Sequence, residues 1–142
     1  MRIDGMNETL INAMFETFPA EITVIDAHDK VIGWNKHHDR LFYRPEACYG
    51  MDFRECHPQK SLDLVENIIG EMKAGTRDKA RFWIDAVVDK EKSVKHKVMI
   101  EFYALRDING AYVGCMETTA DVEDIMHLTG EKRLMNEYEK PE

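Results

Sequence analysis

The chain has 142 residues, of which 32% are charged and 44% are hydrophobic, a balance typical of one folded domain rather than a disordered segment. Acidic residues outnumber basic ones by 27 to 19, and the net charge of −8 argues against a nucleic-acid-binding surface, which needs clustered Lys and Arg. We expect a cytosolic protein without membrane contact, because no apolar run reaches the roughly 18 residues of a membrane span and no signal-peptide pattern is present.

The first third of the chain alternates between helical and extended patterns. Asn7 precedes a segment whose apolar residues recur at helical spacing, which predicts a helix that Asn7 caps and Pro19 ends. Two segments rich in β-branched residues, 21–26 and 31–35, are separated by a polar turn and predict an antiparallel hairpin. Short helical pieces are expected over 36–48.

A longer helix is predicted after the sequence His57-Pro58. It begins at Pro58 or Ser61 and ends at Gly75, because glycine readily adopts the left-handed conformation that ends many helices. One apolar stripe at helical spacing predicts its buried face: Leu62, Val65, Ile68, Ile69 and Met72.

Three more strands follow this helix. Segments 79–89 and 95–105 alternate between apolar and polar residues, and Asn109-Gly110 is a strong hairpin signal before a last strand at 111–120. From Asp121 onward we expect a polar helix with a thin apolar seam. The pattern predicts an α+β fold, in which short helices cover one face of a five-stranded antiparallel sheet and further helices flank it at both ends.

Several of these motifs, in this order along the chain, resemble the PAS family. The opening hairpin, the Tyr49-Gly50 step, the His-Pro turn before the long helix and the last hairpin are all similar to PAS motifs. We therefore divide the chain into an N-terminal helix (1–18), a PAS sensor domain (19–124) and a C-terminal helix and tail (125–142). The resemblance implies a signalling module, not an enzyme, which binds a small molecule or cofactor between the sheet and the middle helices.

A closer resemblance is to the C-terminal PAS module of hemerythrin-domain-containing proteins of anaerobes. The matching segments are 54–61, 82–84 and 130–134. We expect the module alone in this chain, because 142 residues leave no room for a hemerythrin domain as well. This family implies a general sensory role and does not imply a particular ligand.

Residues expected near the cavity are the candidate site. His57 and Cys56 can each ligate a metal or haem iron or hydrogen-bond to a ligand, and the alternative is that His57 only caps the helix. The apolar face of the sheet is either a pocket wall or plain core. The candidate ligand-binding residues are His57, Cys56, Phe42, Phe82, Ile84, Ile100, Phe102 and Met116.

Haem and flavin are open alternatives, and neither has strong support. Haem sensors of the PAS family usually take their ligating His from the long helix, yet 61–73 contains no His, and no Cys-x-x-Cys-His motif is present. Cys56 lacks the Asn-Cys-Arg-Phe-Leu-Gln context of light-driven flavin adducts, and Met116 replaces a polar contact of flavin-binding relatives. No metal site and no catalytic residue are predicted.

A protein-interaction module without a ligand is the second hypothesis. In it the terminal helices form a homodimer interface through Leu10, Ile11, Met14, Phe15 and Phe18 at one end and Ile125, Leu128 and Met135 at the other. The expected partners are thus a small-molecule ligand, a second copy of the chain and a signalling protein, with no nucleic acid and no membrane.

Overall fold

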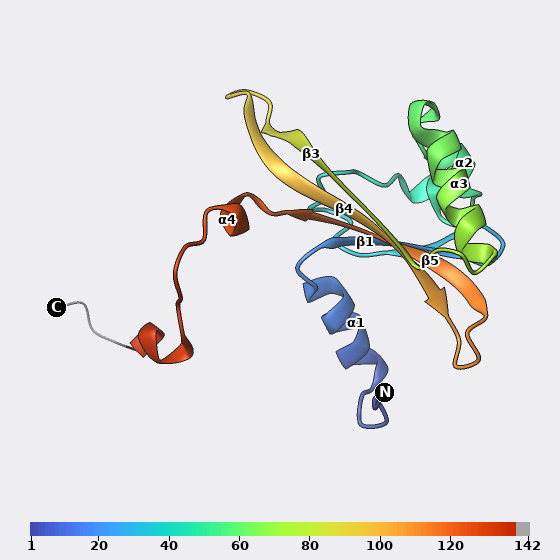
Figure 1. The fold of residues 1–142 in the computed structure, drawn as a ribbon, viewed down its shortest axis with the longest axis horizontal. Helices are drawn as coiled ribbons and strands as arrows, with labels where there is room; N and C mark the ends of the chain where they lie inside the picture. Colours follow the sequence, from blue (N-terminus) through green and yellow to red (C-terminus); the bar gives the residue numbers. More distant parts are fainter. Residues whose placement is uncertain (139–142) are drawn as a thin grey trace.

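A five-stranded antiparallel sheet forms the body of the protein in the computed structural model, which describes residues 1–138 (Figure 1). The strands are β1 (Glu21–Asp26), β2 (Val31–Trp34), β3 (Lys79–Asp89), β4 (Val94–Arg106) and β5 (Tyr112–Asp121). They lie in the order β2-β1-β5-β4-β3, so the opening hairpin joins the sheet beside its last strand. The predicted fold class and all five predicted strands are confirmed.

Helices lie on both sides of this sheet. They are α1 (Glu8–Thr17), η1 (Glu46–Cys48), α2 (Phe53–Cys56), η2 (Gln59–Ser61), α3 (Leu62–Lys73), α4 (Glu123–Met126) and η3 (Leu134–Tyr138), where η marks a 3-10 helix. Figure 1 shows α2 and α3 together on one side of the sheet and α1 on the other. None of the helices in the described part of the chain is both long and apolar enough to cross a bilayer.

Helix α1 begins and ends where its sequence predicts. The side chain of Asn7 accepts a hydrogen bond from the Leu10 N–H at 2.9 Å, and the helix ends before Pro19. No residue of α1 is buried: Leu10, Ile11 and Met14 are exposed, and Phe15 is half-buried.

The side chain of Asn35 attaches α1 to the sheet. It is only 1% exposed, its Oδ1 accepts from the Ile22 N–H at 2.6 Å, and its Nδ2 donates to the carbonyls of Phe15 (2.8 Å) and Ala20 (3.0 Å). One amide therefore satisfies backbone groups at the end of α1 and at the start of β1.

The core lies between α3 and the sheet. The predicted stripe of α3 is confirmed, because Val65, Ile68, Ile69 and Met72 are buried and Leu62 packs against them half-buried. Residues Ile25, Val31, Phe53, Ala80, Phe102 and Cys115 complete the cluster. Gly114 lets β5 approach β1 closely, since a Cβ there would lie 2.3 Å from the carbonyl oxygen of Ile25.

A group of ion pairs holds the β1–β2 turn against the helices. The Asp29 carboxylate is buried in this turn and accepts from Lys73 of α3 at 2.8 Å and from Arg54 of α2 at 3.1 Å. Arg54 also pairs with Asp52 at 3.0 Å and with Glu66. These contacts join the hairpin, α2 and α3 into one unit.

Two predicted helical regions are wrong. Residues 36–45 form turns and bends, and only η1 is helical in the predicted 36–48 segment. The predicted helix from Asp121 onward is a single turn, α4, followed by residues without helix and then by η3. Its apolar seam meets no packing surface, and a short helix without packing is marginal in water. The tail beyond residue 138 lies outside the described residues.

Candidate functional site

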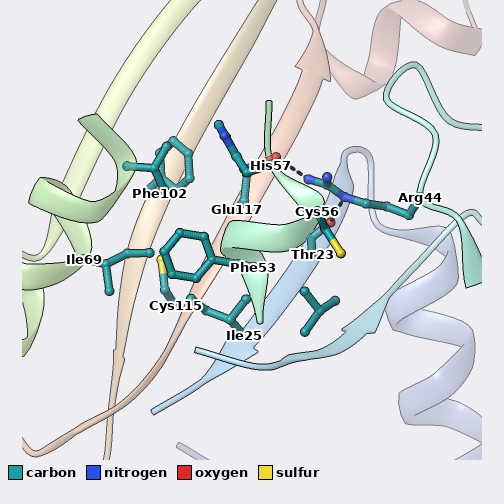
Figure 2. A pocket seen from close by; sticks show the side chains of 12 residues that line it. Thr23, Ile25, Arg44, Phe53, Cys56, His57, Ile69, Phe102, Cys115 and Glu117 are labelled. Carbon is teal, nitrogen blue, oxygen red and sulfur yellow. Dashed lines mark hydrogen bonds and ion pairs between the residues drawn. The ribbon is translucent and has the colours of Figure 1, made fainter. Parts of the chain in front are cut away.

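A cleft of about 560 Å³ opens between α3 and the face of the sheet that carries Phe102. An inner cavity of about 40 Å³ adjoins it in the core, and Figure 2 shows the side chains around this cavity. The cleft is lined by Leu41, Phe42, Tyr43 and Arg44 of one loop, Cys56, His57 and Pro58 after α2, Ser61, Leu64, Val65 and Ile68 near and in α3, and Phe82, Ile100, Phe102 and Glu117 of the sheet.

Six of the eight predicted site residues line these spaces. Cys56, His57 and Phe102 line both the cleft and the inner cavity, whereas Phe42, Phe82 and Ile100 line the cleft alone. The side chains come from the loop, the end of α2 and two strands, so residues far apart in the sequence converge on one space.

The remaining two predicted residues, Ile84 and Met116, line neither space. Met116 was assigned to the wrong face of β5, because it pairs with Tyr103, whereas Phe102 pairs with Glu117. Side chains alternate between the faces of a strand, so Glu117 faces the cleft and Met116 faces away. Ile84 shares the face of the cleft but lies farther along β3, where it is 41% exposed.

An ion pair between Arg44 and Glu117, which the sequence pattern does not predict, lies at the inner end of the cleft. Arg44 Nη2 lies 3.1 Å from Glu117 Oε1, and Arg44 Nε donates to Thr23 Oγ1 at 3.2 Å. The two side chains are 15% and 16% exposed. The available signal was Glu117 itself, a charged residue in the middle of β5 on the same face as Cys115.

The loop that carries Arg44 is held in place although it is not helical. Arg40, whose side chain is 2% exposed, donates to the carbonyls of Ile22 (3.2 Å), Asn35 (2.8 Å) and Phe42 (2.9 Å). Glu21 accepts from the backbone N–H groups of Leu41 and Phe42. These bonds keep one wall of the cleft in place without a ligand.

His57 forms its hydrogen bonds within the turn that precedes α3. Its Nδ1 lies 3.1 Å from the Pro58 carbonyl oxygen and 3.4 Å from Ser61 Oγ. The Pro58 carbonyl can only accept, which favours the tautomer with the proton on Nδ1 and leaves Nε2 as an acceptor. His57 therefore bonds a carbonyl of the turn rather than capping an N–H of the helix.

The thiols of Cys56 and Cys115 are held in their neutral form. Burial and the neighbouring Cys48 thiol raise the pKa of Cys56 to about 11. Burial, with the charge of Glu117, raises the pKa of Cys115 to about 12. Both thiols stay protonated at neutral pH, and reactions and metal binding need the thiolate. Within residues 1–138, no three His, Cys, Asp or Glu side chains are grouped to hold a metal ion.

Solved structures share this fold. A C-terminal domain from Streptococcus mutans matches with a TM-score of 0.76 and 25% identity, over 87% of this chain and 91% of that chain. The PAS domain of a protein from Colwellia psychrerythraea matches with a TM-score of 0.57 and 18% identity, over 82% and 97% of the two chains. A sensory box sensor histidine kinase from Vibrio cholerae gives a TM-score of 0.52 and 12% identity, over 80% and 90%.

No curated protein matches the chain. A family model described as a PAS domain matches residues 11–123, a span that contains all five strands, the cleft and the helices that cover it. This match extends over well more than half of the chain, and the chain therefore belongs to the PAS domain family.

Proposed function

We propose that this PAS domain is a sensor module that binds a small molecule in the cleft between α3 and the sheet. The cleft itself carries the proposal: it is concave, mostly apolar, and holds a few convergent polar groups at one end, which is the usual composition of a small-molecule site. The bonds of Arg40 and Glu21 support it further, because a wall fixed in advance reduces the entropy lost on binding.

The effect of ligand binding in the cleft would be transmitted to the ends of the domain through β1 and β5. Glu117 lies in β5, which leads directly into α4, and Thr23 lies in β1, which Asn35 joins to α1. A ligand changes the docking of these terminal segments only as far as it prefers one arrangement over another. Membership in the PAS family and the likeness to a sensory box kinase support a role in signalling.

A thermal-shift screen of small ring compounds tests this proposal. Wild type is compared with Ile100→Trp, which fills the cleft, and with Met99→Trp, which adds the same ring on the opposite face of β4. We expect compounds that raise the melting temperature of wild type and of Met99→Trp but not of Ile100→Trp. If no compound stabilises wild type, or if both variants respond alike, the proposal fails.

The spectrum of the purified protein decides between colourless and coloured ligands. We expect absorbance near 280 nm only, as for a colourless ligand. A sharp Soret band on adding hemin, abolished by His57→Ala, would instead assign haem, and bound flavin would give its own visible bands.

The three cysteines are unpaired in the structure, which supports a reducing, cytosolic setting. We also propose that the chain is related to the PAS modules of hemerythrin-domain proteins, because segments 54–61, 82–84 and 130–134 resemble them.

Dimerisation through α1 is the second candidate function, and one observation favours it. α1 has ten residues and none is buried, although a helix this short is marginal in water without packing. Exposed side chains of Leu10, Ile11 and Met14 offer a surface for a second copy. Size-exclusion with light scattering should show a dimer that Met14→Asp weakens and Thr9→Asp, also exposed, leaves intact. A monomeric wild type contradicts this candidate.

A further inference from the structure

The ion pair at the inner end of the cleft leaves one donor group and one acceptor atom unused. Arg44 bonds Thr23 through Nε and Glu117 through Nη2, while Glu117 uses Oε1. Among the residues that the structure describes, neither Arg44 Nη1 nor Glu117 Oε2 has a hydrogen-bond partner. Both side chains line the cleft and the inner cavity, so a bound molecule can reach this pair.

Charge limits what can bind beside this pair. The positive charge of the guanidinium and the negative charge of the carboxylate cancel, so the site favours a ligand without net charge. An anion would be repelled by Glu117, and a cation would be repelled by Arg44. Water screens this repulsion only weakly, because the pair is about five-sixths buried. A neutral group that donates to the carboxylate and accepts from the guanidinium satisfies both.

Aromatic side chains determine the shape of the ligand. Phe82 and Phe102 line the cleft with ring centroids 6.3 Å apart and planes at 74°, so the two rings stand edge to face. Flat rings pack well on such surfaces in offset or edge-to-face contacts. A volume of about 560 Å³ is ample for a molecule of two fused rings.

We propose that the cleft binds a flat, neutral ring compound with a hydrogen-bond donor and an acceptor side by side on one edge, as in a lactam. The lactam N–H donates to Glu117 Oε2, and the lactam carbonyl accepts from Arg44 Nη1. The ring plane packs against Phe102 and Phe82. This inference rests on the proposed function, because it specifies the ligand class of the same cleft.

Calorimetric titration with three related probes tests the inference on the full chain. Carbostyril is a two-ring lactam, N-methylcarbostyril lacks the donor, and naphthoate is an anion of similar size. We expect carbostyril to bind, and N-methylcarbostyril to bind about tenfold or more weakly, since a hydrogen bond to a charged group is lost. Naphthoate should bind more weakly than carbostyril. Equal or tighter binding of either comparison compound overturns the inference.

Variants of the pair supply a second test. Glu117→Gln should weaken carbostyril binding, whereas Glu101→Gln, which changes a carboxylate paired with Lys79 and Arg81, should leave it unchanged. The double change Arg44→Met with Glu117→Met avoids an unpaired buried charge and so keeps the fold. It should bind carbostyril and N-methylcarbostyril equally, and retained preference for carbostyril contradicts the assignment of the pair.

The two proposals fail in different ways. If carbostyril does not bind wild type at millimolar concentration, the assignment of a lactam ligand is wrong. The proposed function survives that result if the thermal-shift screen still finds other compounds whose effect Ile100→Trp removes. If that screen is also empty, both proposals fail.

Discussion

Replacing Asn35 with Ala tests how the domain holds its N-terminal helix. The substitution removes three hydrogen bonds, at 2.6, 2.8 and 3.0 Å. The Ile22 N–H is buried and would lose its partner, which costs about 1–3 kcal/mol. The carbonyls of Phe15 and Ala20 are less buried, and each loss costs about 0.5–1 kcal/mol. The sum is about 3 kcal/mol, a large part of the roughly 5–15 kcal/mol that stabilises most domains.

Urea unfolding followed by circular dichroism measures this loss. We expect the midpoint of Asn35→Ala to fall at an unchanged slope, and we expect Asn12→Ala, an exposed change on α1, to alter stability by less than about 0.5 kcal/mol. Asn35→Asp should also destabilise, because a carboxylate cannot donate to two carbonyls. A loss below about 1 kcal/mol for Asn35→Ala would refute the reasoning.

Three further predictions concern β4 and β5. Gly114→Ala should cost more than about 2 kcal/mol in urea unfolding, because its Cβ would lie 2.3 Å from the Ile25 carbonyl oxygen; normal stability contradicts this. Tyr112→Phe should raise stability by about 1 kcal/mol, since the tyrosine hydroxyl is buried without a partner among the described residues; a clear loss contradicts this. A hydrogen bond to Asp121 raises the pKa of His96 above 6.5, so the stabilisation from this pair is fully present below pH 6.5 and is lost as pH rises through the pKa of the folded state; NMR titration should show the raised pKa, and Asp121→Asn should remove most of the shift.

Local pattern was enough to predict most elements of this fold. The alternation in β3 and β4, the Asn-Gly turn and the stripe of α3 are each properties of neighbouring residues, so they are visible in the sequence. The end of the chain was mispredicted because helical spacing alone does not show whether a seam has a surface to pack on. The 36–48 loop was mispredicted because its conformation depends on bonds from Arg40 to distant backbone.

The site was only partly predictable for a related reason. Phe102 and His57 were found from alternation and from a family motif, which are both local signals. Met116 was misplaced because Cys115 and Met116 are both apolar, so the alternation of β5 cannot be read there. The Arg44–Glu117 pair joins residues 73 positions apart, and only the folded chain brings the loop with Arg44 beside β5.

NMR chemical-shift mapping with a library of small ring compounds tests the central claim, that the cleft binds a small molecule, most directly. We predict that bound compounds shift the resonances of Phe82, Ile100 and Phe102 most strongly, with little change at Met99 on the opposite face. Compounds at millimolar concentration that leave all three unchanged, or that shift only the outer face of the sheet, would contradict the account.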